Sequence, residues 1–408
     1  MNADKPAEPG KRWLNSTVLG IGLASLFSDV GHEMATSAMP ALLAMLGAGP
    51  AALGLIEGLA DGLSSYAKLI SGLYSDRLRR RKPLAVIGYF VTASGMASFA
   101  LATQWWHVLL GRVFGWLGRG ARTPVRNVLL TEATTPETYG RAFGLERAMD
   151  SAGAVVGPLL AIGIAAALGP DHFQWLFIFT LVPGLMAALL IALLVRERPH
   201  EPRPQARLGG SLRSLPKPFK EYLVGVGVAG IGDFSNTLLI FWATQAWSQS
   251  KRFDVAEAAT MAMLFYVGYN VVYTVSCYVS GLFADRFPKH WVLSIGYSLA
   301  VIPAAALLWP GDDLAKFAIV FGISGLYMGV WETLENSTAA TMLPAETRGT
   351  GFGLLATVNG VGDFISSALV GYLWAMVSPT AAMMFVMVMS LVGAAIIAWA
   401  GSRAARRS

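Results

Sequence analysis

The sequence predicts an all-α membrane protein built from two pseudo-symmetric six-helix bundles, with both termini in the cytoplasm. Hydrophobic residues make up 54% of the 408 residues and charged residues only 14%, whereas ordinary soluble domains contain about 25% charged residues. Apolar runs of about 20 residues, long enough to cross a bilayer as a helix, recur along the whole chain. The second half also repeats motifs of the first half at a nearly constant spacing. These three observations predict a polytopic helical protein with an internal duplication.

The apolar runs define the expected membrane-spanning helices. Six of them form a predicted amino-terminal bundle over residues 15–195, and six more form a carboxy-terminal bundle over residues 219–400. The twelve spans are expected at 15–45, 50–73, 84–102, 106–128, 143–167, 173–195, 220–247, 256–283, 291–309, 316–340, 351–375 and 380–400. The first run contains Asp29 and Glu33 and exceeds the usual apolar length of a signal peptide, so we interpret it as a retained span.

Basic residues cluster in alternate loops, which predicts the orientation of the chain. The tail 1–14, the Pro- and Arg-rich linker 196–218 and the tail 401–408 all carry several bases. Cytoplasmic loops are enriched in Lys and Arg, so these segments are expected on the cytoplasmic side of the inner membrane. The net charge of +6 follows from this topology, and no nucleic-acid partner is expected.

An internal repeat relates the two predicted bundles. Gly72–Arg77 recurs as Gly281–Arg286, 209 residues later, and the same offset relates Asn127 to Asn336. The triplet Phe-Gly-Leu at 143–145 also recurs at this offset, and Ile-Gly-Tyr at 87–89 recurs one residue short of it. Repeats of this kind place a transport site between two related bundles.

Three motifs resemble those of the major facilitator superfamily of secondary transporters. The loop 72–82 resembles the signature G-x-x-x-D-R-x-G-R-K/R-K/R, and Arg112 with Gly118 and Gly120 is similar to the element R-x-x-Q-G-x-G-x-G. Gly153–Pro158 resembles the G-x-x-x-G-P element of the antiporter subgroups. The resemblance covers essentially the whole chain and points to the twelve-span, proton-coupled drug and metabolite antiporters.

The resemblance implies a cytoplasmic latch in which Asp76 contacts a helix N-terminus in only one access state. A carboxylate at a helix N-terminus is favoured by about 0.3–1 kcal/mol. The repeat places Glu335 at the position equivalent to Arg126, and we expect this acid to pair with arginines of the fourth span. The predicted latch and gating residues are Asp76, Arg77, Arg126, Asp285, Arg286 and Glu335.

Charged residues inside the spans predict a polar interior. Arg112, Arg119, Arg122 and Arg126 share one face of the fourth span. A charge at the bilayer centre costs about 2.5–3.5 kcal/mol, so a lipid-facing stripe is not expected. Acids and bases balance in the first six spans, whereas the acids of spans seven to eleven have no base away from the helix ends. The residues predicted for proton coupling and the substrate cavity are Asp29, Glu33, Asp61, Arg112, Arg119, Asp233 and Asp363.

Aromatic and amide side chains of the second half suggest a pocket for an amphipathic compound. The predicted lining residues are Asn236, Trp242, Asn270, Tyr273 and Trp331. The single cysteine, Cys277, excludes a disulfide framework and a thiolate metal cluster. No resident metal and no cofactor are expected.

The predicted function is proton-coupled efflux of a small organic molecule by alternating access, with protons and the lipid bilayer as further partners. The resemblance implies a monomer. An importer or a uniporter of a small metabolite is an alternative, and a transition-metal exporter using Asp29, His32 and Glu33 is another. A membrane-embedded enzyme is disfavoured, because the chain has no H-E-x-x-H, G-x-S-x-G or phosphate-binding glycine motif.

Overall fold

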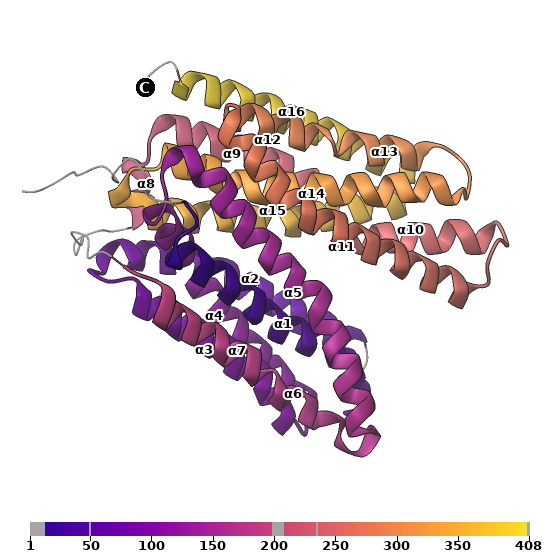
Figure 1. Cartoon of the computed structure of the whole chain (residues 1–408). Helices are drawn as coiled ribbons and strands as arrows, with labels where there is room; N and C mark the ends of the chain where they lie inside the picture. Colours follow the sequence, from indigo (N-terminus) through magenta and orange to yellow (C-terminus); the bar gives the residue numbers. More distant parts are fainter. Residues whose placement is uncertain (1–12, 49, 198–207, 234–235, 406–408) are drawn as a thin grey trace, which may run out of the picture. The chain divides into compact units, whose positions relative to one another are not determined.

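The computed structural model describes residues 13–48, 50–197, 208–233 and 236–405. Throughout these ranges the chain forms helices joined by turns and contains no β-strand, which confirms the predicted all-α class. The chain divides into two compact units (Figure 1). Unit 1 comprises Met1–Ser214 and Leu343–Leu354, and unit 2 comprises Leu215–Met342 and Leu355–Ser408.

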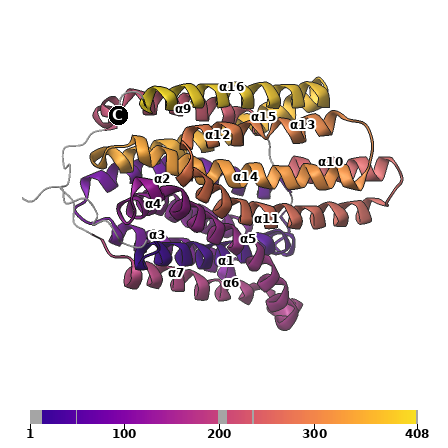
Figure 2. The ribbon, with the colours of Figure 1, turned by 45° about the horizontal axis from the view of Figure 1, so that its top comes forward.

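Unit 1 is a bundle whose long helices have roughly aligned axes (Figure 2). Its helices are α1 Ser16–Met45, α2 Pro50–Arg77, α3 Lys82–Ala97, α4 Trp105–Glu132, α5 Tyr139–Leu168, α6 Leu176–Phe179, α7 Leu181–Leu194 and α8 Leu208–Ser214. α1 packs against α5 and α7, α4 packs against α2 and α3, and α3 also contacts α7. A buried apolar cluster that includes Met34, Leu42, Phe99 and Phe177 fills one end of this bundle.

Two glycines of the Gly153–Pro158 motif set the separation of α1 and α5. A Cβ atom at Gly153 would lie 2.7 Å from the carbonyl oxygen of Leu26, and one at Gly157 would lie 2.7 Å from that of Val30. Real Cβ atoms do not approach backbone this closely, so only glycine allows the two helices to touch here. The motif therefore has a packing role that is independent of the direction of transport.

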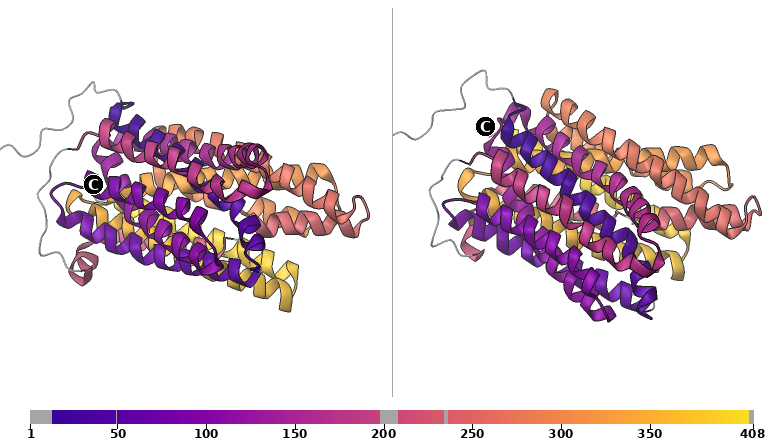
Figure 3. Two further views of the ribbon diagram at one scale, coloured as in Figure 1. Left: turned by 90° about the horizontal axis from the view of Figure 1, so that it is seen from below. Right: turned by 60° about the horizontal axis from the view of Figure 1, so that its bottom comes forward.

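Unit 2 is a second helical bundle, seen from two further sides in Figure 3. Its helices are α9 Lys217–Ile231, α10 Asn236–Gln249, α11 Val255–Arg286, α12 Lys289–Ser298, α13 Val301–Leu308, α14 Leu314–Met342, α15 Arg348–Met376, whose first residues belong to unit 1, and α16 Pro379–Ala405. α11 packs along α14, α16 packs against α9, α12 and α13, and α10 contacts α11.

The seventh predicted span, 220–247, differs from the observed structure because it is not one helix. α9 ends at Ile231, Gly232 and Asp233 are not helical, and α10 begins at Asn236. Glycine costs about 1 kcal/mol in a helix interior, and a Cβ atom at Gly232 would lie 2.5 Å from Cβ of Met389 on α16. The close approach of α16 therefore requires glycine at position 232, directly after the end of α9.

Eight helical stretches in the described part of the chain are long and apolar enough to cross a membrane by composition. The charge-bearing helices α1, α2 and α4 are not among them. The buried charges of unit 1 include Asp29 of α1, Arg112, Arg122 and Arg126 of α4, and Glu146 and Asp150 of α5.

Candidate functional site

The arginine stripe of α4 lies inside unit 1, where acids of neighbouring helices form ion pairs with Arg112, Arg119 and Arg126. Arg112 is only 2% exposed and donates two hydrogen bonds to the carboxylate of Glu57 on α2, at 2.9 and 3.0 Å. It also donates to the hydroxyl of Thr36 on α1, at 2.9 Å. Both hydrogen bonds to Glu57 come from Nη2 of Arg112, and charge-assisted bonds of this kind are stronger than those between neutral groups.

Asp150 of α5 is the centre of a second group of ion pairs. Arg147 donates to it at 2.9 Å, and guanidinium nitrogens of Arg126 and Arg119 lie 3.9 and 4.0 Å away. Arg119 also donates to Asp29 of α1 at 3.1 Å. The predicted coupling residues Asp29 and Arg119 are therefore joined in one ion pair.

Arg126 finds its partners inside unit 1. It lies 2.6 Å from Glu146 of α5 and donates to the hydroxyl of Ser25 at 3.0 Å. Ser25 in turn donates to Glu146 at 2.7 Å. These contacts close a buried triad across α1, α4 and α5.

Aromatic rings support the same stripe. The guanidinium carbons of Arg112 and Arg119 lie 5.2 and 5.1 Å from the centroid of the Trp116 ring. Arg122 lies 3.9 Å above the ring of Tyr89. Its Nε and Nη1 atoms find no hydrogen-bond acceptor among the described residues. Cation–π contacts of this kind contribute about 0.5–2 kcal/mol each.

The three residues of the alternative metal site are close in sequence but have different neighbours. His32 is buried with its Nε2 atom 3.8 Å from Glu33, and its ring meets the edge of Trp116 at 5.1 Å. Asp29 is held by Arg119 instead. Within the described ranges, no three His, Cys, Asp or Glu side chains are grouped so that they could hold a metal ion.

Asp61 lies apart from these pairs. It is exposed on α2, one turn after Glu57, whose carboxylate Arg112 occupies. Lys68, expected on the same face, is half-buried.

At the end of α2, the carboxylate of Asp76 caps the N-terminus of α15. Gly349 and Thr350 donate their backbone N–H groups at 2.9 and 2.8 Å, and the Thr350 hydroxyl donates at 2.7 Å. A capping carboxylate satisfies helix N–H groups that have no partner within the helix. The structure thus brings the predicted latch residue to a helix N-terminus, while partly buried Arg77 follows it at the last position of α2.

Three neighbours of this cap were not predicted from the sequence. Arg81 is buried, forms an ion pair with Glu132 at the end of α4, and lies 3.9 Å from Asp76. Glu197 accepts hydrogen bonds from the backbone N–H groups of Arg81 and Lys82 at the start of α3. Arg81 belongs to the basic run 77–82 of the sequence motif. No sequence pattern, however, predicts that it contacts Glu132 or Glu197, which are remote in the chain.

The repeated copy of this motif, at the end of α11, has its own partner in unit 2. Lys289 lies 3.3 Å from Asp285 and donates to the carbonyl of Ala284 at 2.9 Å. Arg286 is exposed at the helix end.

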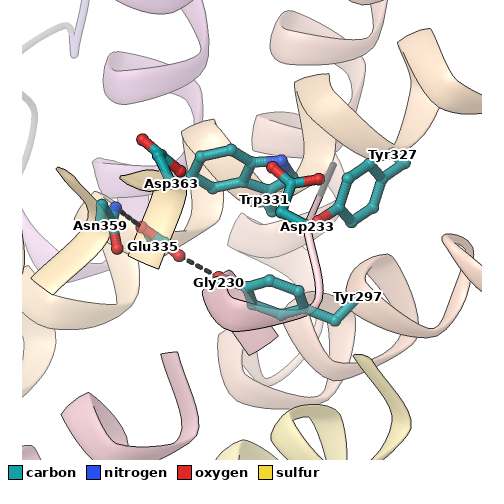
Figure 4. Close-up of a pocket in the computed structure, with 8 residues that line it drawn as sticks. All are labelled: Gly230, Asp233, Tyr297, Tyr327, Trp331, Glu335, Asn359 and Asp363. Carbon is teal, nitrogen blue, oxygen red and sulfur yellow. Dashed lines mark hydrogen bonds between the residues drawn. The ribbon is translucent and has the colours of Figure 1, made fainter. Parts of the chain in front are cut away.

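A small recess in unit 2 gathers acids and aromatic rings from four helices and the turn after α9 (Figure 4). Its lining residues are Gly230, Asp233, Tyr297, Tyr327, Trp331, Glu335, Asn359 and Asp363. It has room for about one water molecule. The predicted residues Asp233, Glu335, Asp363 and Trp331 therefore share one site.

Glu335 lies deepest in this recess and is 1% exposed. Its carboxylate accepts hydrogen bonds from the hydroxyl of Tyr297 and the amide of Asn359 (Figure 4). The hydroxyl of Tyr222 donates to its backbone carbonyl at 3.0 Å. All three donors are neutral, in contrast to the guanidinium partners of the unit 1 acids.

Three aromatic rings line the recess. Tyr297 stacks near Trp331 with 6.4 Å between ring centroids and 20° between planes, and Tyr327 lies 6.3 Å from Tyr297 and 6.4 Å from Trp331. Figure 4 shows the carboxylates of Asp233, Glu335 and Asp363 around the indole of Trp331. Asp363 is exposed and Asp233 is half-buried, so the acids extend from the surface to the buried Glu335.

The other predicted lining residues do not reach this recess. Trp242 packs against Trp374 with 4.3 Å between ring centroids, Tyr273 donates to Glu332, and Asn270 donates to the carbonyl of Tyr266 at 2.8 Å. The side chain of Asn236 lies outside the described part of the structure.

Sequence reasoning missed Tyr297 and Asn359 as site residues, although the repeat contained a signal. Asn359 stands 209 residues after Asp150, and Tyr297 stands 208 residues after Tyr89. Their counterparts both lie beside the arginine stripe of unit 1.

Comparison with known proteins identifies relatives over the whole chain. The sequence pattern of the Major Facilitator Superfamily matches residues 21–366 and 226–407. An uncharacterised MFS-type transporter of Methanocaldococcus jannaschii is 25% identical over 386 residues, which cover 95% of each chain. The multidrug resistance protein MdtH of Photorhabdus laumondii is 36% identical over 109 residues, covering 26% of this chain and 27% of that protein.

Solved structures share the fold at low sequence identity. The fucose:proton symporter FucP of E. coli has a TM-score of 0.74 and 16% identity, covering 95% of this chain and 99% of its own. The human organic anion transporter MFSD10 has a TM-score of 0.73 and 14% identity, covering 96% and 100%.

Proposed function

Because this chain belongs to the Major Facilitator Superfamily, and is therefore a multi-pass membrane transporter rather than an enzyme, we propose that it exports a small organic compound in exchange for protons. The proposed location is the cytoplasmic membrane, with both termini in the cytoplasm, as the distribution of basic loops favours. Both bundles belong to one chain, so a monomer suffices for alternating access.

The observation that carries the proposal is the contrast between Glu335 and the paired acids of unit 1. Asp29, Glu57, Glu146 and Asp150 each lie 2.6–3.1 Å from a guanidinium nitrogen. Glu335 is buried at least as deeply as Asp29, Glu146 and Asp150, but its carboxylate is contacted by a phenol and an amide. A buried carboxylate without a cation is costly to keep ionised, and a proton is its simplest neutralising partner.

Hydroxyl, amide and carboxyl groups of the helices that pack against Glu335 surround its side chain. The polar and titratable groups that face it are Tyr222 of α9, Asp233 after α9, Tyr297 of α12, Tyr327 and Glu332 of α14, and Asn359 and Asp363 of α15. Among the described residues, no lysine or arginine lines the recess. The exposed Asp363 and half-buried Asp233 provide acceptors along a route for protons to Glu335.

The direction of transport rests on partial similarity to drug-resistance proteins. MdtH of Photorhabdus laumondii and MdtH of Cronobacter sakazakii match 26% and 34% of this chain. The name of these relatives, multidrug resistance protein, favours export of an organic compound over its import.

The sign of pH-driven flux tests the proposal. The purified protein is reconstituted into liposomes with a pH gradient and offered radiolabelled organic cations, anions and neutral drugs. An antiporter moves its substrate toward the acidic compartment, a symporter toward the alkaline one, and a uniporter toward neither. This sign does not depend on the orientation of the protein, and protein-free liposomes correct for passive trapping of weak bases. Accumulation on the alkaline side would refute export by exchange.

Replacing Glu335 tests the proton site within the same assay. Glu335→Gln removes the titrating oxygen but retains hydrogen bonding, so we expect pH-driven accumulation to vanish while substrate counterflow continues. Asp313→Asn, which changes an exposed acid beyond the other end of α14, is the matched control and should behave as wild type. Undiminished pH-driven accumulation by Glu335→Gln would remove Glu335 from the coupling mechanism.

A further inference from the structure

We infer that the recess of unit 2 binds the ammonium group of a small organic cation, which would make primary amines the substrate class. The inference rests on the transport function proposed above and specifies its substrate. It is carried by three independent features of the recess: the ring faces of its wall, the sign of its charge and its size.

The ring faces provide the first part of the recognition. Tyr297, Tyr327 and Trp331 line the recess, and their ring centroids lie 6.3–6.4 Å from one another. Ammonium groups are attracted to the faces of Trp and Tyr within about 6 Å of the ring centroid, and desolvated contacts are worth about tenfold in affinity or more. An anion would meet the negative faces of the same rings.

The charge of the recess points to the same ligand. Asp233, Glu335 and Asp363 line it, and no lysine or arginine does so in the described ranges. Three arginines of unit 1, Arg112, Arg119 and Arg126, already form ion pairs with Glu57, Asp29, Asp150 and Glu146. The recess therefore favours a cation electrostatically, and like-charge repulsion would exclude a carboxylate or phosphate ligand.

The size of the recess restricts which cation can enter. The space accommodates about one water molecule, which is close to the size of a primary ammonium group. A trimethylammonium group is several times larger and would have to displace Trp331 or Tyr327. The hydrophobic remainder of the ligand must then lie outside the recess, on the side of the exposed Asp363.

Shared occupancy explains how such a ligand would be exchanged for a proton. An ammonium group beside Asp233 and Asp363 adds a positive charge near Glu335 and favours release of its proton. Conversely, a proton on Glu335 removes one of the negative charges that attract the ammonium group. Binding of each cation therefore weakens binding of the other, which is the linkage that exchange requires.

The test measures binding of three probes to the full-length protein in nanodiscs at neutral pH by calorimetry. The probes are 2-phenylethylamine, its N,N,N-trimethyl derivative and 2-phenylethanol, which share one apolar body. We expect the amine to bind at least about tenfold more tightly than either analogue. Equal binding of the alcohol would overturn the role of charge, and equal binding of the trimethyl compound would overturn the size restriction.

Variants then assign the binding to this recess. Asp363→Asn, at an exposed position that should not impair folding, is expected to weaken amine binding about tenfold, whereas the control Asp313→Asn should not change it. Trp331→Phe keeps an aromatic ring, but a phenyl ring attracts cations less strongly than an indole. This variant should therefore weaken binding of the amine more than binding of the alcohol. Unchanged amine affinity in both recess variants would overturn the inference.

The outcomes separate this inference from the proposed function. Amine binding without pH-driven flux of any compound would contradict proton-coupled export and leave the ammonium site standing. pH-driven flux of neutral or anionic drugs, without amine binding, would contradict the ammonium site and leave proton-coupled export standing.

Discussion

Arg126 and Glu335 stand at equivalent positions of the internal repeat but carry opposite charges. In unit 1, Arg126 lies 2.6 Å from Glu146 and 3.9 Å from Asp150. In unit 2, the residue equivalent to Asp150 is Asn359, and its amide donates to Glu335. The same pair of positions thus holds an ion pair in one unit and an uncharged hydrogen-bond partner for an acid in the other. This substitution explains at the residue scale why proton chemistry is proposed for unit 2.

The buried triad of Arg126 predicts a large loss of stability when one charge is removed. Arg126→Ala leaves Glu146, which is 2% exposed, without its cation, and we expect a cost of about 3–5 kcal/mol. Chemical unfolding in detergent, followed by circular dichroism, measures this change. The double variant Arg126→Met with Glu146→Leu removes both charges and should recover most of the loss. If the double variant is as unstable as the single one, packing rather than charge accounts for the effect.

At the scale of helices, two kinds of contact set the positions of α1, α2, α5 and α15. α5 approaches α1 through glycines, where its backbone meets that of α1 directly. α15 begins where the carboxylate of Asp76 on α2 caps its free N–H groups. The contact of α1 with α5 requires glycine, which has no side chain, and the cap of α15 requires the single carboxylate of Asp76. Each contact can therefore be tested by one substitution.

Gly157 and Gly163 on α5 form a matched pair for testing helix packing. A Cβ atom at Gly157 would lie 2.7 Å from the carbonyl oxygen of Val30, whereas one at Gly163 would have no neighbour within 4 Å. Gly157→Ala should therefore destabilise the protein by about 1–3 kcal/mol, as measured by its thermal unfolding midpoint. Gly163→Ala should be neutral or stabilise α5 by up to about 1 kcal/mol. Equal effects of the two substitutions would contradict the proposed close contact.

The cap formed by Asp76 predicts a graded series of variants. Asp76→Ala removes the acceptor of three hydrogen bonds from Gly349 and Thr350 and should cost about 0.5–2 kcal/mol. Asp76→Asn keeps a capping oxygen and should lose less. Thermal unfolding reports the stability, and counterflow reports whether the cap also controls access, as the latch hypothesis requires. Wild-type counterflow in both variants would leave Asp76 with a capping role alone.

At the scale of the whole molecule, the described helices form two units that neutralise buried charge in different ways. Unit 1 contains its own guanidinium–carboxylate pairs, and the recess of unit 2 contains acids and aromatic rings. The alternating-access mechanism of the superfamily requires two such bundles that move as bodies. This contrast is the reason that the exchangeable proton and cation are proposed to bind in unit 2.

The sequence by itself determined the helical membrane class, the duplication and the inward face of the arginine stripe. These properties depend on apolar length, loop charge and helical periodicity, which are all local features of a chain. The internal repeat can also be found from the sequence alone, because it requires only a comparison of the first half of the chain with the second half.

Only the tertiary structure decided which partners the charges have and where the seventh span breaks. The sequence placed Glu335 among gating residues, yet its carboxylate meets Tyr297 and Asn359, which come from different helices of unit 2. α9 stops before Gly232, where a Cβ atom would lie 2.5 Å from Cβ of Met389 on α16. Such contacts depend on distances between helices that are remote in sequence, and a hydrogen bond or ion pair exists only when packing brings its two atoms within about 3–4 Å.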